Sequence, residues 1–158
     1  MVLKIDYKAL LKNLAVPLLV GIAAGLLTRS SVEAFNETAI QPPFAPPGFL
    51  FPIVWTVLYA LMGISAYLVE ATASKANKKT AQILYLLQLF FNFCWSFIFF
   101  TFEAYTFAFI WIIILLALII ATTVEFYKIN KTAGLLMLPY IIWVTFAAVL
   151  NLSIALLN

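Results

Sequence analysis

The sequence contains no histidine, a single cysteine and few charged side chains, and each shortage excludes a class of protein. One thiol, Cys94, cannot form an intrachain disulfide, and without histidine there is no ligand set for zinc or haem iron. The commonest general base is missing as well. Charged residues make up 9% of the chain and hydrophobic residues 66%, whereas soluble domains have about 25% charged and about 45–50% apolar residues. We therefore predict no metal site, no conventional acid–base centre, and a protein surrounded by lipid.

The net charge of +3 does not indicate a nucleic-acid-binding protein. The basic residues stand in short clusters between apolar runs and form no stripe interleaved with aromatic side chains. The basic N-terminal segment and the apolar run behind it resemble a leader, but no small-residue cleavage pattern is clear. We expect this first run to remain as a membrane anchor.

Five apolar runs are long enough to cross a bilayer. A helix rises about 1.5 Å per residue, so a hydrocarbon core of about 30 Å takes about 20 residues. Backbone groups in lipid must be bonded internally, and the runs lack the two-residue alternation of a barrel strand. We predict an all-α integral membrane protein, a single domain over residues 1–158, with a proline-rich loop between the first and second helices. The expected spans are residues 10–28, 49–71, 81–102, 105–127 and 133–157.

Lysine and arginine are distributed unevenly between the two ends of the predicted bundle. Of the nine such residues, Arg29 alone falls in the first loop, and none falls in the third loop or after the fifth span. The others lie in the N-terminal segment, the second loop and the fourth loop. Because cytoplasmic loops are enriched in Lys and Arg, we expect a cytoplasmic N-terminus and an external C-terminus. The setting we expect is a bacterial inner or plasma membrane.

Neutral polar and aromatic side chains recur at a spacing of four in three predicted helices, which places them on one side of each helix. The centres of the spans carry no Asp, Glu, Lys or Arg, which argues against an ion-coupled transporter. Two interpretations stay open: interhelical hydrogen bonds worth about 0.6–2 kcal/mol each, or a shared ligand cavity, which we favour for the set as a whole. The stripes are Trp55, Tyr59 and Ser65; Gln88, Asn92 and Ser96 with Tyr85 and Trp95; and Trp143, Ala147 and Asn151.

Small residues and prolines mark further positions in the spans. Gly21 and Gly25 form a pair that allows another helix to approach closely, within the bundle or in a second copy of the chain. Pro17, Pro52 and Pro139 each favour a kink unless they stand in a first turn, and Pro52 is early enough to mark a helix start.

Four segments carry motifs that are weak singly and specific in this order. They are Pro46-Pro47 followed by Phe51 and the run from Val54 to Gly63; Asn92-Phe93-Cys94-Trp95; Thr122-Thr123; and Pro139-Tyr140 with Trp143, Ala147 and Asn151. From Gly21 to the C-terminus this pattern resembles the TspO/MBR family, the translocator or tryptophan-rich sensory proteins.

The resemblance implies a five-helix bundle, often dimeric, whose ligand cavity opens toward the first loop, with that loop as a lid. Members bind porphyrins such as protoporphyrin IX and synthetic isoquinolines or benzodiazepines, and animal members bind cholesterol. We expect Trp55 and Asn92 to be the main polar contacts. Carried over by position, the cavity residues are Trp55, Tyr59, Asn92, Trp95, Ser96, Trp143, Ala147 and Asn151, and the lid residues are Phe44, Pro46 and Pro47.

The sequence departs from the family pattern at two places. Phe44 stands where the first loop usually carries a tryptophan, so a stacking face is kept and an indole donor is lost. The proposed cholesterol-recognition pattern needs a tyrosine followed by a basic residue late in the fifth helix, and no tyrosine follows Tyr140.

The leading hypothesis is a membrane protein that binds porphyrins or other flat hydrophobic ligands in a sensory, regulatory or transport role. It requires no cofactor, and its partners are the bilayer, the ligand and, in a homodimer, a second copy of itself. One alternative is light- and oxygen-dependent porphyrin degradation through Trp55 and Trp143, which has been credited to some members. A passive small-molecule transporter and a purely structural scaffold are the others.

Overall fold

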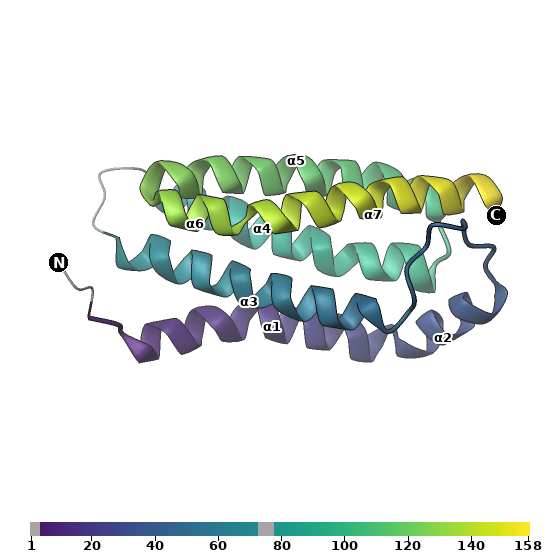
Figure 1. Cartoon of the computed structure of the whole chain (residues 1–158), viewed down its shortest axis with the longest axis horizontal. Helices are drawn as coiled ribbons and strands as arrows, with labels where there is room; N and C mark the ends of the chain where they lie inside the picture. Colours follow the sequence, from purple (N-terminus) through teal and green to yellow (C-terminus); the bar gives the residue numbers. More distant parts are fainter. Residues whose placement is uncertain (1–3, 73–77) are drawn as a thin grey trace.

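The computed structural model describes residues 4–72 and 78–158, and within these ranges the chain is helical and contains no strand. Five helical segments are long and apolar enough to cross a membrane, which confirms the predicted all-α membrane bundle. They lie side by side along one axis, with the two termini at opposite ends (Figure 1). The helices are α1 (Tyr7–Leu27), α2 (Arg29–Thr38), α3 (Leu50–Ala71), α4 (Lys78–Ser96), the π-helical η1 (Phe97–Thr101), α5 (Tyr105–Ile129), α6 (Lys131–Leu136) and α7 (Leu138–Leu157).

The two ends of the bundle differ in charge and in the elements they carry. At one end α1 and α4 begin and α3 and α5 end; we call it the basic end, because Lys8, Lys12, Lys78 and Lys128 lie there. The opposite end, here the loop end, carries α2 and residues 39–49, which lie beside the C-terminus (Figure 1).

Asparagine and aspartate side chains fix the helix ends that the apolar runs leave uncertain. α1 begins three residues before the predicted span because the Asp6 carboxylate accepts hydrogen bonds from the backbone N–H groups of Lys8 and Ala9, at 3.0 and 3.1 Å. Asn130 caps α6 in the same way, accepting from the N–H of Ala133 at 3.1 Å. The connection between α5 and α6 is therefore a single residue.

The fifth span consists of two helices, α6 and α7, that meet at Met137. Pro139 lies in the first turn of α7, where its missing N–H leaves no helical bond unmade. Pro52 stands in the first turn of α3, as predicted for a helix start. Pro17 is buried inside α1, which stays helical through it.

At Gly63 of α3 the backbone comes very close to the backbone of α1. A Cβ on Gly63 would lie 2.7 Å from the Cα of Leu14 and 2.9 Å from the carbonyl oxygen of Asn13, closer than real side chains come. Of the predicted small-residue pair, Gly21 faces the ring of Tyr59 and leaves no room for a side chain. A Cβ on Gly25 would meet no described atom within 4 Å, so this glycine borders open space.

The larger of the two buried apolar clusters extends to the basic end, where Ala81, Phe126 and Ile129 belong to it. There α3, α5, α6 and α7 enclose fully buried side chains, among them Met62, Ile119, Met137 and Val144. A smaller, mainly aromatic cluster around Phe35 and Phe99 lies at the loop end. Between these two packed regions the helices leave a cavity.

Candidate ligand cavity

A cavity of about 960 Å³ lies in the loop half of the bundle, lined by α1, α2, α3, α4, η1, α7 and the loop before α3. Its volume is within the range of about 300–1,000 Å³ that is usual for small-molecule sites. We call it the loop-end cavity. Aromatic and aliphatic side chains dominate its walls, so a ligand that fits here is mostly apolar.

The structure brings seven of the eight predicted cavity residues to this wall. Pro46 and Pro47 of the predicted lid line it as well. Phe44 does not; its ring is half exposed and packs edge-on against Phe146, with 6.5 Å between centroids. The lining residues predicted from the sequence are Trp55, Tyr59, Asn92, Trp95, Ser96, Ala147 and Asn151.

Trp143 is the predicted cavity residue that the wall does not include. Its indole packs against the ring of Phe51, a lining residue, at 5.8 Å, and against Phe146 at 5.5 Å, so it stands one layer behind the wall. Its N–H is buried and has no partner among the described residues. Trp143 and Ala147 are four residues apart and share one side of α7, as predicted. The Trp143 side chain is large, however, and extends toward Phe51 of α3.

A buried chain of hydrogen bonds forms the floor of the cavity. The Tyr59 hydroxyl donates to the Asn92 amide oxygen at 2.7 Å, and the Asn92 amide nitrogen donates to the Tyr140 hydroxyl at 2.8 Å. The Tyr140 hydroxyl then donates to Gln88 at 2.8 Å. α3, α4 and α7 are joined by this chain, so Asn92 belongs both to the cavity wall and to the bonds between helices.

Tyr140 is a site residue that sequence reasoning missed. It is 1% exposed, its hydroxyl serves both Asn92 and Gln88, and its ring meets the edge of Trp55 at 6.1 Å. The sequence offered only its place beside Pro139 in a motif, because no polar residue precedes it at helical spacing in α7.

A second pair of polar side chains is also satisfied within the protein. The Trp95 indole N–H donates to the Asn151 amide oxygen at 3.1 Å, and the Asn151 amide nitrogen donates to the backbone carbonyl of Tyr105 at 2.9 Å. The Trp95 ring stacks on Phe99 at 4.9 Å. These groups therefore shape the wall and offer ring faces, not free donors.

Trp55 and Ser96 provide the donors that remain free at the wall. Neither the Trp55 indole N–H nor the Ser96 hydroxyl has a hydrogen-bond partner in the described part of the chain. The Trp55 ring is held by stacking on Tyr59, with centroids 5.5 Å apart and planes 30° apart. Trp55 thus lines the cavity and carries an N–H without a described partner.

Arg29 places a positive charge at the mouth of the cavity. Its Nε lies 3.2 Å from Glu33, one turn later in α2, and both side chains are mostly exposed. The terminal guanidinium nitrogens make no hydrogen bond to a described residue. In the sequence, Arg29 contributed only to the predicted membrane orientation and was not predicted to lie at the cavity. Its position between an apolar run and the predicted lid could have indicated this.

An aromatic cluster formed by α2 and η1 makes up part of the cavity wall. Phe35 of α2 packs against Phe99 and Phe100, each at 5.3 Å between centroids. In η1 the Phe97 carbonyl accepts from the Phe102 N–H, five residues on, at 2.9 Å. π-helical segments are frequent at functional sites, and this one carries two lining residues, Phe99 and Phe100.

Metal chemistry finds no support in the described residues, where no three His, Cys, Asp or Glu side chains gather into a group that could hold an ion. The cavity is suited to binding: it offers apolar ring faces, two free neutral donors, and at its mouth the guanidinium of Arg29 paired with the carboxylate of Glu33.

Comparison with known proteins agrees with this picture. A model of the TspO/MBR family matches residues 13–157. A tryptophan-rich protein TspO from Chlorobaculum tepidum is 35% identical over 142 residues, 89% of this chain and 90% of that protein. A tryptophan-rich sensory protein from Cereibacter sphaeroides is 34% identical over 126 residues, 80% of this chain and 78% of that protein. Translocator protein 2 from Canis lupus familiaris is 30% identical over 137 residues, with 85% and 80% covered.

Proposed function

The chain belongs to the TspO/MBR family, and from this premise we propose that its loop-end cavity binds porphyrins and other flat hydrophobic ligands. It is a multi-pass membrane protein, and the names of its relatives support a sensory or transport role. The observation that carries the proposal is the cavity itself, about 960 Å³ with aromatic walls and the ion pair of Arg29 and Glu33 at its mouth.

The arrangement suits a tetrapyrrole such as protoporphyrin IX, a flat apolar ring that carries carboxylates along one edge. The ring stacks on aromatic faces of the wall, such as the indoles of Trp55 and Trp95. The carboxylates lie toward the mouth, where Arg29 supplies a guanidinium that pairs well with planar anions. The apolar part is then buried while the charges remain near water.

In this proposal Trp55 contacts the ligand directly and Asn92 acts through its neighbours. Trp55 has a free N–H, whereas both sides of the Asn92 amide are already hydrogen-bonded. Asn92 holds the Tyr59 hydroxyl, and Tyr59 supports the stacked indole of Trp55. Asn92 is therefore a positioning residue rather than the ligand contact expected from the sequence.

The decisive experiment is titration of the detergent-purified protein with protoporphyrin IX, followed by quenching of tryptophan fluorescence. We expect Trp55→Phe to weaken binding about five- to tenfold, because a hydrogen bond is lost and the stacking face is kept. Trp111→Phe is the matched control: Trp111 stacks on Phe91 at 4.3 Å, donates to its carbonyl and does not line the cavity.

Equal affinities of the parent protein and Trp55→Phe would contradict the proposed contact. Quenching that does not saturate, or that is lowered equally by Trp111→Phe, would show that the porphyrin merely partitions into detergent. Arg29→Gln gives a further check, since it should weaken the binding of protoporphyrin more than the binding of an uncharged porphyrin ester.

A second function, light-driven degradation of the bound porphyrin, is favoured by the stacked pair of Trp55 and Tyr59. Such stacked, oxidisable rings can pass an electron to a photoexcited neighbour in van der Waals contact. Trp143 is one layer behind the wall, so Trp55 is the tryptophan concerned. Illumination with and without oxygen tests it: an unchanged porphyrin spectrum with intact Trp55 would rule this activity out.

A further inference from the structure

A second pocket, of about 210 Å³, lies at the other end of the bundle from the loop-end cavity. α1, α3, α4 and α5 form it, and we call it the basic-end pocket. Lys12, Glu70, Tyr85 and Phe126 all stand within about two helical turns of their helix ends. In a bilayer this depth is the boundary between headgroups and acyl chains. The lining residues are Lys12, Asn13, Val16, Ala66, Val69, Glu70, Gln82, Tyr85, Leu86 and Phe126.

Tyr85 brings an unsatisfied donor to this pocket. The residue is 6% exposed, and its hydroxyl has no hydrogen-bond partner in the described chain. Its ring is fixed against Phe126, with centroids 5.5 Å apart. Side chains on a helix lean toward its N-terminus, which for α4 is the basic end. A buried hydroxyl without a partner is costly, so an acceptor from outside the chain is the natural occupant.

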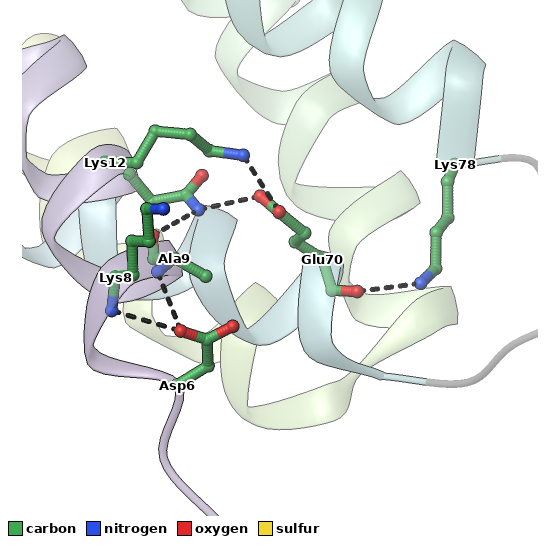
Figure 2. A network of polar contacts seen from close by, with 7 residues as sticks. Asp6, Lys8, Ala9, Lys12, Glu70 and Lys78 are labelled. Atoms are coloured by element: carbon green, nitrogen blue, oxygen red, sulfur yellow. Dashed lines mark hydrogen bonds and ion pairs between the residues drawn. The ribbon is translucent and has the colours of Figure 1, made fainter.

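Lys12 and Glu70 line the pocket, and Lys78, outside the lining, contacts Glu70 from the other side (Figure 2). The two carboxylate oxygens of Glu70 are already used, one by the Lys12 ammonium at 2.9 Å and the other by the Asn13 amide at 2.8 Å. Lys78 donates to the backbone carbonyl of Glu70 at 3.1 Å, a neutral group that leaves its charge uncancelled. One carboxylate thus faces two ammonium groups, and an anion is favoured.

The pocket also has an apolar side that faces lipid. Val16 of α1 and Leu86 of α4 line it, and they are 40% and 58% exposed on the outside of the bundle. α1 packs mainly against α3 and less extensively against α4, so the pocket lies beside the more lightly packed of these two seams. An occupant can therefore enter sideways and keep an apolar portion in the membrane.

We propose that the basic-end pocket binds the glycerol–phosphate region of an anionic phospholipid. The phosphate pairs with the Lys12 ammonium at the pocket, with the charge of Lys78 nearby, and an ester carbonyl accepts the hydrogen bond of the Tyr85 hydroxyl. The acyl chains continue along Val16 and Leu86. A soluble phosphate would satisfy the lysines but leave the apolar side of the pocket unfilled, whereas a phospholipid occupies both.

Delipidated protein in detergent, titrated with dioleoylphosphatidylglycerol or dioleoylphosphatidylcholine and analysed by native mass spectrometry, tests the proposal. We expect the anionic lipid to bind at least fivefold more tightly. Tyr85→Phe, which keeps the ring against Phe126, and Lys12→Gln should each weaken it about fivefold. Lys131→Gln removes an exposed charge at the same end, outside the pocket, and should change affinity less than twofold.

Thermal unfolding separates binding from a merely structural role. Without lipid, Tyr85→Phe should melt no lower than the parent, because it deletes an unpaired donor. With phosphatidylglycerol, the variant should lose part of the lipid-induced rise in melting temperature.

Equal binding of the two lipids, an equal effect of Lys131→Gln, or an unchanged affinity of Tyr85→Phe would overturn the proposal. So would glycerol 3-phosphate binding as tightly as the lipid, or a second copy of the chain occupying the seam. Tyr85→Phe and Lys12→Gln should bind protoporphyrin with the affinity of the parent protein. The proposal of phospholipid binding can therefore fail without affecting that of porphyrin binding, and the reverse.

Discussion

Asn92 holds two aromatic side chains of the loop-end cavity in place with a single amide. Its oxygen accepts from Tyr59 and its nitrogen donates to Tyr140, from two other helices. The residue is 4% exposed, so water does not replace these bonds when they are lost. At the scale of single residues, the order of the cavity wall therefore depends on a few satisfied amides.

Asn92→Ala is expected to lower stability by about 1–2 kcal/mol, because it leaves two buried hydroxyls short of a partner. Ser96→Ala, one turn further along the same wall, should cost almost nothing, since the Ser96 hydroxyl has no described partner to lose. Thermal unfolding in detergent compares the two. Equal midpoints for both variants would contradict the role given to Asn92.

Helix packing between α1 and α3 depends on the absence of a side chain at Gly63. The backbone of α1 occupies the space that a Cβ would need, at Leu14 and Asn13. Backbone cannot yield as a flexible side chain does, so the helices must separate if the position is filled.

Gly63→Ala should therefore destabilise the bundle by about 1–3 kcal/mol through overpacking. Gly25→Ala is the matched control, because a Cβ there meets no described atom within 4 Å; its stability should equal or exceed that of the parent. The larger change Gly25→Leu should leave stability near normal and weaken protoporphyrin binding severalfold by filling the cavity. A stable Gly63→Ala variant would show that α1 moves freely over α3.

Asn158, the C-cap of α7, holds the loop that borders the cavity through two hydrogen bonds, in addition to the ring contact between Phe44 and Phe146. The Asn158 side chain accepts from the backbone N–H of Ile40 at 3.0 Å and donates to its carbonyl at 2.9 Å. This two-bond contact joins the loop to the helix that carries Ala147, Leu150 and Asn151 of the cavity wall.

Asn158→Ala is expected to loosen the loop while the bundle keeps its stability. Amide hydrogen exchange of residues 39–49 should accelerate severalfold, and protoporphyrin should dissociate about two- to fivefold faster. Ser153→Ala, on the exposed side of α7, serves as the control. Unchanged exchange at residues 39–49 would mean that the prolines and the ring contact between Phe44 and Phe146 hold the loop.

For the molecule as a whole, the uneven distribution of lysine predicts one orientation in the membrane, with the basic end in the cytoplasm. In a Cys94→Ser background, Glu37→Cys in α2 should react with a membrane-impermeant maleimide in intact cells. Lys131→Cys, also exposed but at the basic end, should react only after permeabilisation. The reverse pattern would place the cavity mouth in the cytoplasm.

Run length and hydropathy predicted the five spans to within a few residues, because crossing lipid demands a continuous apolar helix. α2 was not predicted, since its sequence is polar and Thr28, its N-cap, makes no side-chain capping bond. Contacts of Phe35 with Phe99 and Phe100, distant in sequence, stabilise it instead. Local sequence carries no sign of such tertiary support.

Helical spacing predicted most of the cavity wall for a similar reason: residues four apart share a side, and polar ones in lipid turn inward. Spacing does not say how far a side chain reaches, which is why Trp143 was placed at the wall although it packs behind Phe51. Spacing also does not show which polar side chains are hydrogen-bonded to one another. Asn92 and Asn151, both predicted as ligand contacts, line the cavity and are also hydrogen-bonded to side chains of other helices.

The π-helical turn at η1 gives the chain a natural place for an insertion or deletion. A helix advances about 100° per residue, so removing one residue from 97–101 would restore α-helical bonding and swing everything beyond it by that angle. Phe99 and Phe100 would then lose their ring contacts with Phe35, and the cavity would lose the part of its wall that these rings form. Deleting a single codon in this stretch would therefore open the cavity on the side of η1. Such a deletion offers evolution, or an engineer, a one-step change in the size of ligand that the protein can bind.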